Sequence, residues 1–272
     1  SYCIRNMKTA ALAQRLRHGG VVLPTRSTKE FTSLPEGNAI LPSPEELTED
    51  DIRFYGFVFQ DSDLYKWIEA ASYVLAYRWD DELKKRIDGM VELIASVMMD
   101  DGYMDTFYII NDPASRFTNL RDHHELYCFG HMAEAAAAYY EVTGEKNLLK
   151  LAERFAECIS DNIGPEPGKK HGYPGHELAE MALMRMYECT GNKKYLELAG
   201  YFVDERGRKP LYFNEEHNEP DGDLRYYQSH KPVREQTEAV GHAVRAMYFY
   251  SGVTDVARVH ADSGLWDAAG RL

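Results

Sequence analysis

The stretch Tyr140-Glu141-Val142-Thr143-Gly144 returns 47 residues later as Tyr187-Glu188-Cys189-Thr190-Gly191. In each copy it closes a long apolar segment, and a second segment with apolar residues at three- and four-residue spacing follows. That spacing is typical of amphipathic helices, and glycine tolerates the left-handed conformation that commonly ends a helix. The repeat therefore predicts a series of stacked α-helical hairpins, with the turn of each hairpin at its Thr-Gly.

The pattern extends on both sides of these two copies. A weaker third copy, Tyr248 to Gly252, predicts another helix that ends at its Ser-Gly. Upstream, apolar residues over 64–75 and 83–97 predict a hairpin with a turn at Trp79-Asp80-Asp81. Asp63 has the side chain of an N-cap for the first helix of that hairpin. We therefore expect about four hairpins from Asp63 onward.

The first part of the chain follows a different pattern. Ile4 to Leu16 predicts one amphipathic helix. Residues 19–50 are rich in Gly, Pro, Ser and Thr and predict a long irregular loop. We therefore divide the chain into an irregular N-terminal segment with one helix, residues 1–54, and a helical array, residues 55–272.

The composition limits the classes of partner. A net charge of −13 and a sequence pI of about 5.2 argue against a nucleic acid or an anionic membrane surface, because phosphate groups bind to basic surfaces. No apolar run approaches the about 18 residues of a membrane span. The first residues lack a signal-peptide pattern, so we expect a cytoplasmic protein, or an exported one whose signal peptide has been lost. The helical cysteines are expected to be buried, reduced thiols: Cys128, Cys158 and Cys189.

Three histidines recur in the helical array. His124, His176 and His242 each stand at or near the start of the first helix of a hairpin. Polar residues that cluster in a helical pocket are typical of a ligand site, and a neutral imidazole can donate or accept a hydrogen bond. We therefore interpret the three as ligand contacts at repeat-equivalent positions. The polar, Tyr-rich insertion at 207–232 is expected on the binding face.

Other groups are weaker candidates for chemistry. His124, Cys128 and His131 share one helical face, which permits a metal site, but a buried Cys and a core His are the more common use of such residues. Asp61 and Asp105 stand at helix ends, where they serve either as caps or as the carboxylate pair of a glycosidase. Motifs of esterases, nucleotide hydrolases and dehydrogenases are absent from the sequence.

In order and spacing, several motifs resemble glycoside hydrolase family 127, the β-L-arabinofuranosidase family once filed as a domain of unknown function. The resemblance runs from about Tyr55 to Leu272, and residues 1–50 match weakly. The motifs are Val58-Phe59-Gln60-Asp61-Ser62-Asp63, Asp101-Gly102-Tyr103-Met104-Asp105-Thr106, His124-Glu125-Leu126-Tyr127 with Gly130-His131, His171-Gly172-Tyr173-Pro174-Gly175-His176, and Pro232-Val233-Arg234-Glu235-Gln236-Thr237 with Gly241-His242-Ala243-Val244-Arg245.

The resemblance implies an all-α fold, an (α/α)6 barrel that needs about six hairpins to close and is incomplete in this chain. It implies retaining cleavage of terminal β-L-arabinofuranose, with His124, His176 and His242 in contact with the sugar. We expect Gln60 and Asp61 to join them in binding the substrate. In the family, a zinc-held cysteine thiolate is the nucleophile and a glutamate is the acid/base.

The family's zinc cysteines and its acid/base glutamate lie downstream of the segment that matches Gly241 to Arg245. We therefore expect this chain to carry sugar-binding residues but no catalytic pair and no zinc ligands. The expected partners are a carbohydrate and either a second copy in a dimer or the C-terminal remainder of the barrel. Two alternatives stay open: a non-catalytic carbohydrate-binding or scaffold domain, and another α/α-barrel sugar enzyme such as an epimerase or an unsaturated-uronide hydrolase.

Overall fold

The computed structural model describes residues 2–25 and 52–272, and in these residues four helical hairpins follow one another. Within the described residues there is no β-strand, only an isolated bridge between Ile163 and Lys170. The hairpins are α2 (Asp61–Tyr77) with α3 (Asp81–Val97), α5 (Glu125–Thr143) with α6 (Asn147–Asn162), α7 (Ala179–Thr190) with α8 (Lys193–Glu205), and α10 (Ala243–His260) with α11 (Ser263–Arg271). The remaining helices are α1 (Tyr2–His18), α4 (Thr106–Asn111), α9 (Tyr212–His217) and the 3₁₀ turns Pro113–Ser115, Arg225–Tyr227 and Val233–Glu235.

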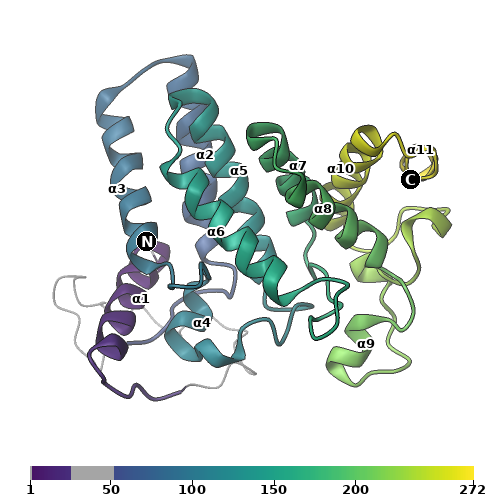
Figure 1. Cartoon of the computed structure of the whole chain (residues 1–272), viewed down its shortest axis with the longest axis horizontal. Helices are drawn as coiled ribbons and strands as arrows, with labels where there is room; N and C mark the ends of the chain where they lie inside the picture. The colour runs from purple at the N-terminus through teal and green to yellow at the C-terminus, as the bar shows by residue number, and fades with distance from the viewer. Residues whose placement is uncertain (1, 26–51) are drawn as a thin grey trace.

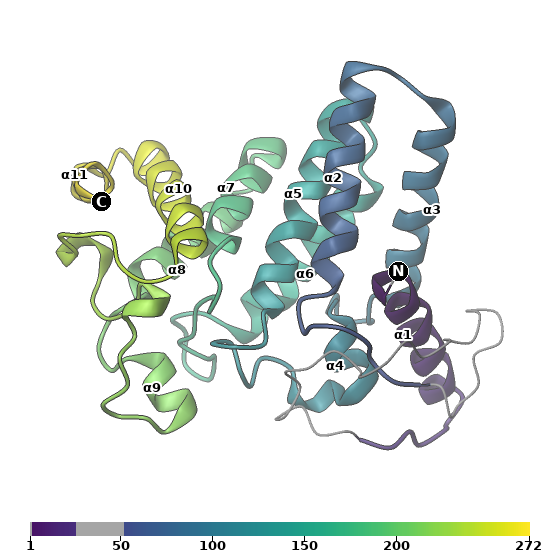
Figure 2. The same cartoon turned by 180° about the vertical axis from the view of Figure 1, so that it is seen from behind.

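The first helices of the four hairpins form one continuous row. α2 packs on α5, α5 on α7, and α7 on α10, while each also packs on the second helix of its own hairpin. Figures 1 and 2 show the hairpins side by side, from α3 at one end to α11 at the other. The predicted all-α array of four hairpins is therefore confirmed, and it corresponds to part of an α/α barrel.

The two copies of the repeat end as predicted. Gly144 follows α5 with φ 76° and Gly191 follows α7 with φ 70°, and the amide of each donates to the carbonyl four residues earlier. This left-handed closure is the one that glycine accommodates without a Cβ clash. The short turn to the next helix follows directly, so the motif that revealed the repeat also ends its helices.

The third copy does not end a helix, and that prediction was wrong. α10 continues through Gly252 to His260. A Cβ on Gly252 would lie 2.8 Å from the Cβ of Glu180 and 3.0 Å from the amide nitrogen of Met181. The missing side chain thus lets α10 lie close against the first turn of α7, which is a packing role rather than a terminating one.

The caps of the first hairpin also differ from expectation. α2 begins at Asp61, so Asp63 lies inside the helix and is not its N-cap. Gln60 takes the capping position without a side-chain bond. Carboxylate caps do occur at the next two helices, where Asp80 accepts from the amide of Leu83 and Asp105 from those of Phe107 and Tyr108.

The predicted N-terminal helix is present as α1 and belongs to the same core. It packs on α2, α3 and α4. The side chain of Asn6 pairs with the backbone of Tyr55, donating to its carbonyl at 2.8 Å and accepting from its amide at 3.0 Å. Most of the predicted loop at 19–50 lies outside the described residues. Cys128 and Cys158 are buried thiols as expected, but Cys189 is only half-buried.

Candidate functional site

Three imidazoles from three separate segments meet at one end of the row of first helices. The ring centroid of His176 lies 5.6 Å from that of His124 and 6.0 Å from that of His242. His124 immediately precedes α5, His176 precedes α7 by three residues, and His242 immediately precedes α10. Residues more than 100 positions apart in the sequence thus form one cluster, which we call the histidine cluster.

Backbone contacts fix two of the imidazoles as acceptors toward a ligand. The Nδ1 of His124 lies 2.6 Å from the carbonyl oxygen of Asp122, and that of His176 lies 3.0 Å from the carbonyl oxygen of Glu177. A carbonyl only accepts, so each Nδ1 carries the proton of the neutral ring. Burial lowers the pKa of His124 to about 4 and that of His176 to about 3. Both rings are therefore neutral near pH 7, with a lone pair on Nε2.

His242 has the opposite polarity. It is the N-cap of α10, and its Nδ1 accepts from the amide of Arg245 at 3.4 Å. An accepting Nδ1 leaves the proton on Nε2, which is then a donor. The cluster thus offers two acceptors and one donor, and this suits a ligand that carries hydroxyl groups.

Aromatic rings surround the cluster. The ring of Phe59 lies 5.1 Å from that of His124, Tyr127 lies 4.3 Å from His176, and Tyr226 lies 5.5 Å from His242. Tyr226 is about half exposed and comes from the insertion, so this part of the insertion lies beside the cluster. Such rings can stack on the apolar face of a sugar. Sequence reasoning did not single out these rings, although Tyr127 follows His124 by one helical turn.

The histidines are equivalent in space but not in the register of the repeat, contrary to expectation. With the 47-residue offset, His124 aligns with His171, and His176 aligns with Phe129 inside α5. The segment that corresponds to the first two turns of α5 is not helical before α7. Its Gly175 lies so close to the backbone that a Cβ would meet the Arg121 carbonyl oxygen at 2.0 Å. This unwound segment is what places His176 in the cluster.

The predicted site residues of the motif at 58–63 do not contact the cluster histidines directly. Asp61 is 2% exposed, and its two carboxylate oxygens accept from the amide and the hydroxyl of Thr106 at 2.7 and 2.6 Å. Gln60 donates to Asp63 at 2.5 Å and stands beside Phe59, the ring that contacts His124. Asp105 is buried as the cap of α4.

A buried group of charged side chains connects the segments that form the site. Arg206, which is 0% exposed, lies 3.1 Å from Glu177 and 3.1 Å from Glu180. It also donates to the carbonyls of Pro174 and Tyr227. These contacts connect the segment that holds His176 to the insertion that supplies Tyr226, so Arg206 fixes two walls of the site relative to each other.

The described residues do not fit a metal centre. No group of three or more His, Cys, Asp or Glu among them lies close enough to hold a metal ion. His124, Cys128 and His131 therefore do not form a metal site in this structure. Burial beside Asp105 and Asp61 raises the pKa of the Cys128 thiol well above its usual value. The Cys128 thiol is therefore protonated near neutral pH in this structure, and because the described residues hold no zinc-ligand set, we derive no step through zinc.

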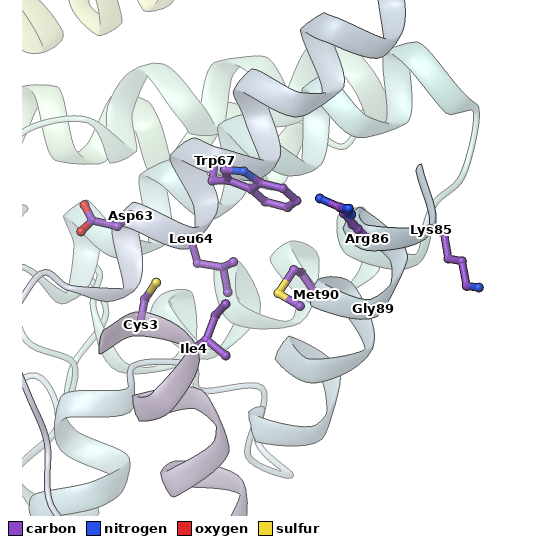
Figure 3. A pocket seen from close by; sticks show the side chains of 9 residues that line it. All are labelled: Cys3, Ile4, Asp63, Leu64, Trp67, Lys85, Arg86, Gly89 and Met90. Atoms are coloured by element: carbon purple, nitrogen blue, oxygen red, sulfur yellow. The ribbon is translucent and has the colours of Figure 1, made fainter. Parts of the chain in front are cut away.

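A separate hollow of about 570 Å³ lies between α1, α2 and α3 (Figure 3). It is lined mainly by apolar side chains, including Ile4, Leu64, Trp67 and Met90. Among the described residues no histidine lines it, and two of its charged side chains, Asp63 and Lys85, lie at opposite sides of it in Figure 3 rather than converging on one point, as groups that orient a small ligand do. The histidine cluster is therefore the better candidate for chemistry.

Comparisons with known proteins agree with this geometry. Residues 8–272 match the model of the β-L-arabinofuranosidase GH127 catalytic domain. The chain belongs to glycoside hydrolase family 127. The match begins at Lys8, so it also includes N-terminal residues where the sequence motifs gave only a weak resemblance.

Several family 127 proteins are similar over most of this chain. It is 44% identical over 238 residues to a non-reducing end β-L-arabinofuranosidase of Bifidobacterium longum subsp. longum, covering 82% of this chain and 36% of that protein. A GH127 β-L-arabinofuranosidase structure from Geobacillus stearothermophilus T6 has 45% identity and a TM-score of 0.79, covering 81% and 36%. A GH127 β-arabinofuranosidase named BT3674 has 35% identity and a TM-score of 0.77, covering 99% and 37%.

The chain thus spans about a third of the length of these relatives. Within the described residues, no helix is both long and apolar enough to cross a membrane.

Proposed function

We propose that this family 127 chain supplies the sugar-binding part of a glycoside hydrolase that acts on terminal β-L-arabinofuranosyl groups. The observation that carries the proposal is the convergence of His124 and His242 on His176, whose ring centroid lies 5.6 Å from the first and 6.0 Å from the second. Each ring is held by a backbone contact. In such a site the imidazoles bind sugar hydroxyls, and the aromatic rings cover the apolar face of the sugar.

We also propose that the groups that cleave the glycosidic bond lie outside the described residues. The buried acids near the cluster are engaged elsewhere: Asp61 by Thr106, Glu125 by Tyr103, and Glu177 by Arg206. Zinc, which the resemblance implies for the complete enzyme, would likewise be held elsewhere, and a chelator would then abolish activity without affecting sugar binding by the cluster. Gln60 remains a proposed sugar contact. Asp61, whose oxygens both accept from Thr106, is proposed to contribute indirectly, by fixing the turn in which it stands next to Gln60.

The test is hydrolysis of p-nitrophenyl β-L-arabinofuranoside by the natural full-length protein. We expect His124→Ala and His176→Ala each to lower kcat/KM by about 10- to 100-fold, since an unmade hydrogen bond in a buried site costs about 1–3 kcal/mol. The p-nitrophenyl α-L-arabinofuranoside serves as the stereochemical comparison and should be a poor substrate.

His260→Ala is the matched control, because His260 is exposed at the other end of α10. Its kcat/KM should equal that of the wild type. Unchanged kinetics in both cluster variants would show that the histidines do not bind the sugar. A wild-type protein that is inactive on the β-arabinoside would refute the proposed activity itself.

A further inference from the structure

Arg245 is a buried cation beside the histidine cluster, and its side chain has no hydrogen-bond partner among the described residues. It stands in the first turn of α10, three residues after His242, and is 6% exposed. Its Nε and Nη1 are buried and make no hydrogen bond to any described residue. Buried polar groups are nearly always hydrogen-bonded, and an unpartnered donor on a charged group is among the most costly exceptions. This exception therefore calls for a partner outside the described residues.

The position of the guanidinium identifies which side of α10 it faces. Its charge contributes to the lowered pKa of both His124 and His176, which come from the neighbouring segments of the row. The rings of Tyr226 and Tyr227 each lie 4.8 Å from its central carbon. Arg245 is thus held by stacking against the insertion, and one of the rings that hold it, Tyr226, also lies 5.5 Å from His242.

Another arginine, Arg206, makes the close contacts with the nearby buried acids, while Arg245 acts on Glu177 through its charge. Glu177 is the nearby buried acid, and its contact at 3.1 Å is with Arg206. Arg206 in turn donates to the carbonyls of Pro174 and Tyr227. The Nε and Nη1 of Arg245 make no hydrogen bond to a described residue. Both arginines are buried, so they differ in their partners and not in their exposure.

We infer that Arg245 is a ligand-binding residue of this site and donates, together with His242, to oxygen atoms of the ligand. His124 and His176 accept from hydroxyl groups of the same ligand. The site thus has a donor half and an acceptor half. A neutral sugar matches both halves, because its hydroxyls donate while its ring and hydroxyl oxygens accept. A carboxylate only accepts and would leave the two acceptor imidazoles unmatched. This inference deepens the proposed function and rests on it.

The experiment measures both sugar binding and hydrolysis in the full-length protein. L-arabinose binding is followed by isothermal titration calorimetry, with D-galacturonate as the acidic comparison, and kcat and KM are measured on p-nitrophenyl β-L-arabinofuranoside. We expect Arg245→Met to weaken L-arabinose binding by about 10- to 100-fold, the scale of a hydrogen bond from a charged donor. Arg245→Lys, which keeps the charge on a long stem, should recover part of the loss.

A change in histidine titration shows whether the charge of Arg245 reaches the histidine cluster. Without the guanidinium charge, the pKa of His124 and His176 should rise in Arg245→Met, and NMR titration of the imidazole signals measures this directly. Arg258→Met is the matched control, because Arg258 lies on the same helix, is exposed and pairs with Glu188. It should leave binding and both titrations unchanged.

The outcomes distinguish the inference from the proposed function. A wild type that binds L-arabinose but does not hydrolyse the arabinoside refutes the function, and the inference stands if Arg245→Met loses binding. A wild type that is active while folded Arg245→Met and Arg245→Lys keep wild-type affinity overturns the inference alone. Tighter binding of galacturonate than of L-arabinose, or no binding of either, also overturns it.

Discussion

The two copies of the repeat have the same ends and different beginnings. α5 and α7 both close at a left-handed glycine after Thr, but α5 has 19 residues and α7 has 12. The missing turns of α7 are replaced by the unwound segment before Ala179, where His176 stands. The comparison teaches that the repeat keeps the packing of one helix end, while the other end varies and places His176 in the histidine cluster.

The copies also differ in how they hold a buried acid. In the first copy, Glu125 accepts from neutral donors: the hydroxyl of Tyr103 at 2.5 Å and the amide of Phe117 at 3.0 Å. In the second copy, a guanidinium pairs with Glu177 and Glu180. That guanidinium belongs to Arg206, which occupies the register position of an apolar core residue, Ile159, in the first copy.

The largest expected effect comes from removing that cation. Arg206→Met should lower the free energy of unfolding by about 3–5 kcal/mol, because Glu177 and Glu180 would remain buried without their partner. Urea unfolding of the purified protein measures the loss. The exposed neighbour Arg208 provides the control, and Arg208→Met should change stability by less than about 0.5 kcal/mol. A stable Arg206→Met protein would mean that the second copy tolerates an apolar residue as the first does.

A smaller effect, on the pH dependence of the free energy of unfolding, is expected from Glu125 in the first copy. Burial raises the pKa of Glu125 to about 8, above its unfolded value of about 4.5. The folded state then binds the extra proton, so this group makes stability fall as pH rises from 4.5 through 8. In Glu125→Gln we expect the loss of stability between pH 5.5 and 8.5 to shrink by on the order of 2 kcal/mol.

Unfolding curves at the two pH values provide the measurement. Glu177, whose pKa is also raised to about 8 by burial, remains in the variant and keeps part of the pH dependence. An identical pH dependence in Glu125→Gln and wild type would show that Glu125 is not protonated in the folded chain.

The smallest effect tests the shared ends. Gly144→Ala and Gly191→Ala should each cost about 1 kcal/mol, and by equal amounts, because an added Cβ is strained at positive φ. No described atom lies within 4 Å of that Cβ at either site. Gly89→Ala, inside α3 and equally unobstructed, should instead stabilise by about 0.5–1 kcal/mol. Thermal unfolding compares the three, and unequal losses at Gly144 and Gly191 would break the equivalence of the copies.

Much of the fold was predictable from local sequence. Apolar spacing gave the first hairpin and α1, and the Thr-Gly pairs gave the ends of α5 and α7. These features depend on residues within a few positions of one another. Gly252 misled for the same reason: its role comes from contact with Glu180 and Met181, about 70 residues away in the sequence, and no local pattern distinguishes a packing glycine from a terminating one.

The site was predictable only in part. The three histidines were found because of their place before helices, and the structure brings them together. Arg206 and Arg245 could not be assigned from spacing, because an arginine in a helical pattern is usually an exposed one. Asp61 shows the converse case. Its place in a motif predicted a ligand contact, but both of its carboxylate oxygens accept hydrogen bonds from Thr106.

The low pKa values of His124 and His176 have a consequence for where the protein can work. Histidine is the side chain that most often senses acidification, but these two imidazoles remain uncharged well below neutral pH. Under the proposed function, capture of a neutral sugar near neutral pH would therefore exchange no proton with the buffer at either ring. The acceptor half of the site offers the same surface in an acidified medium as in a neutral one, and it cannot act as a pH sensor.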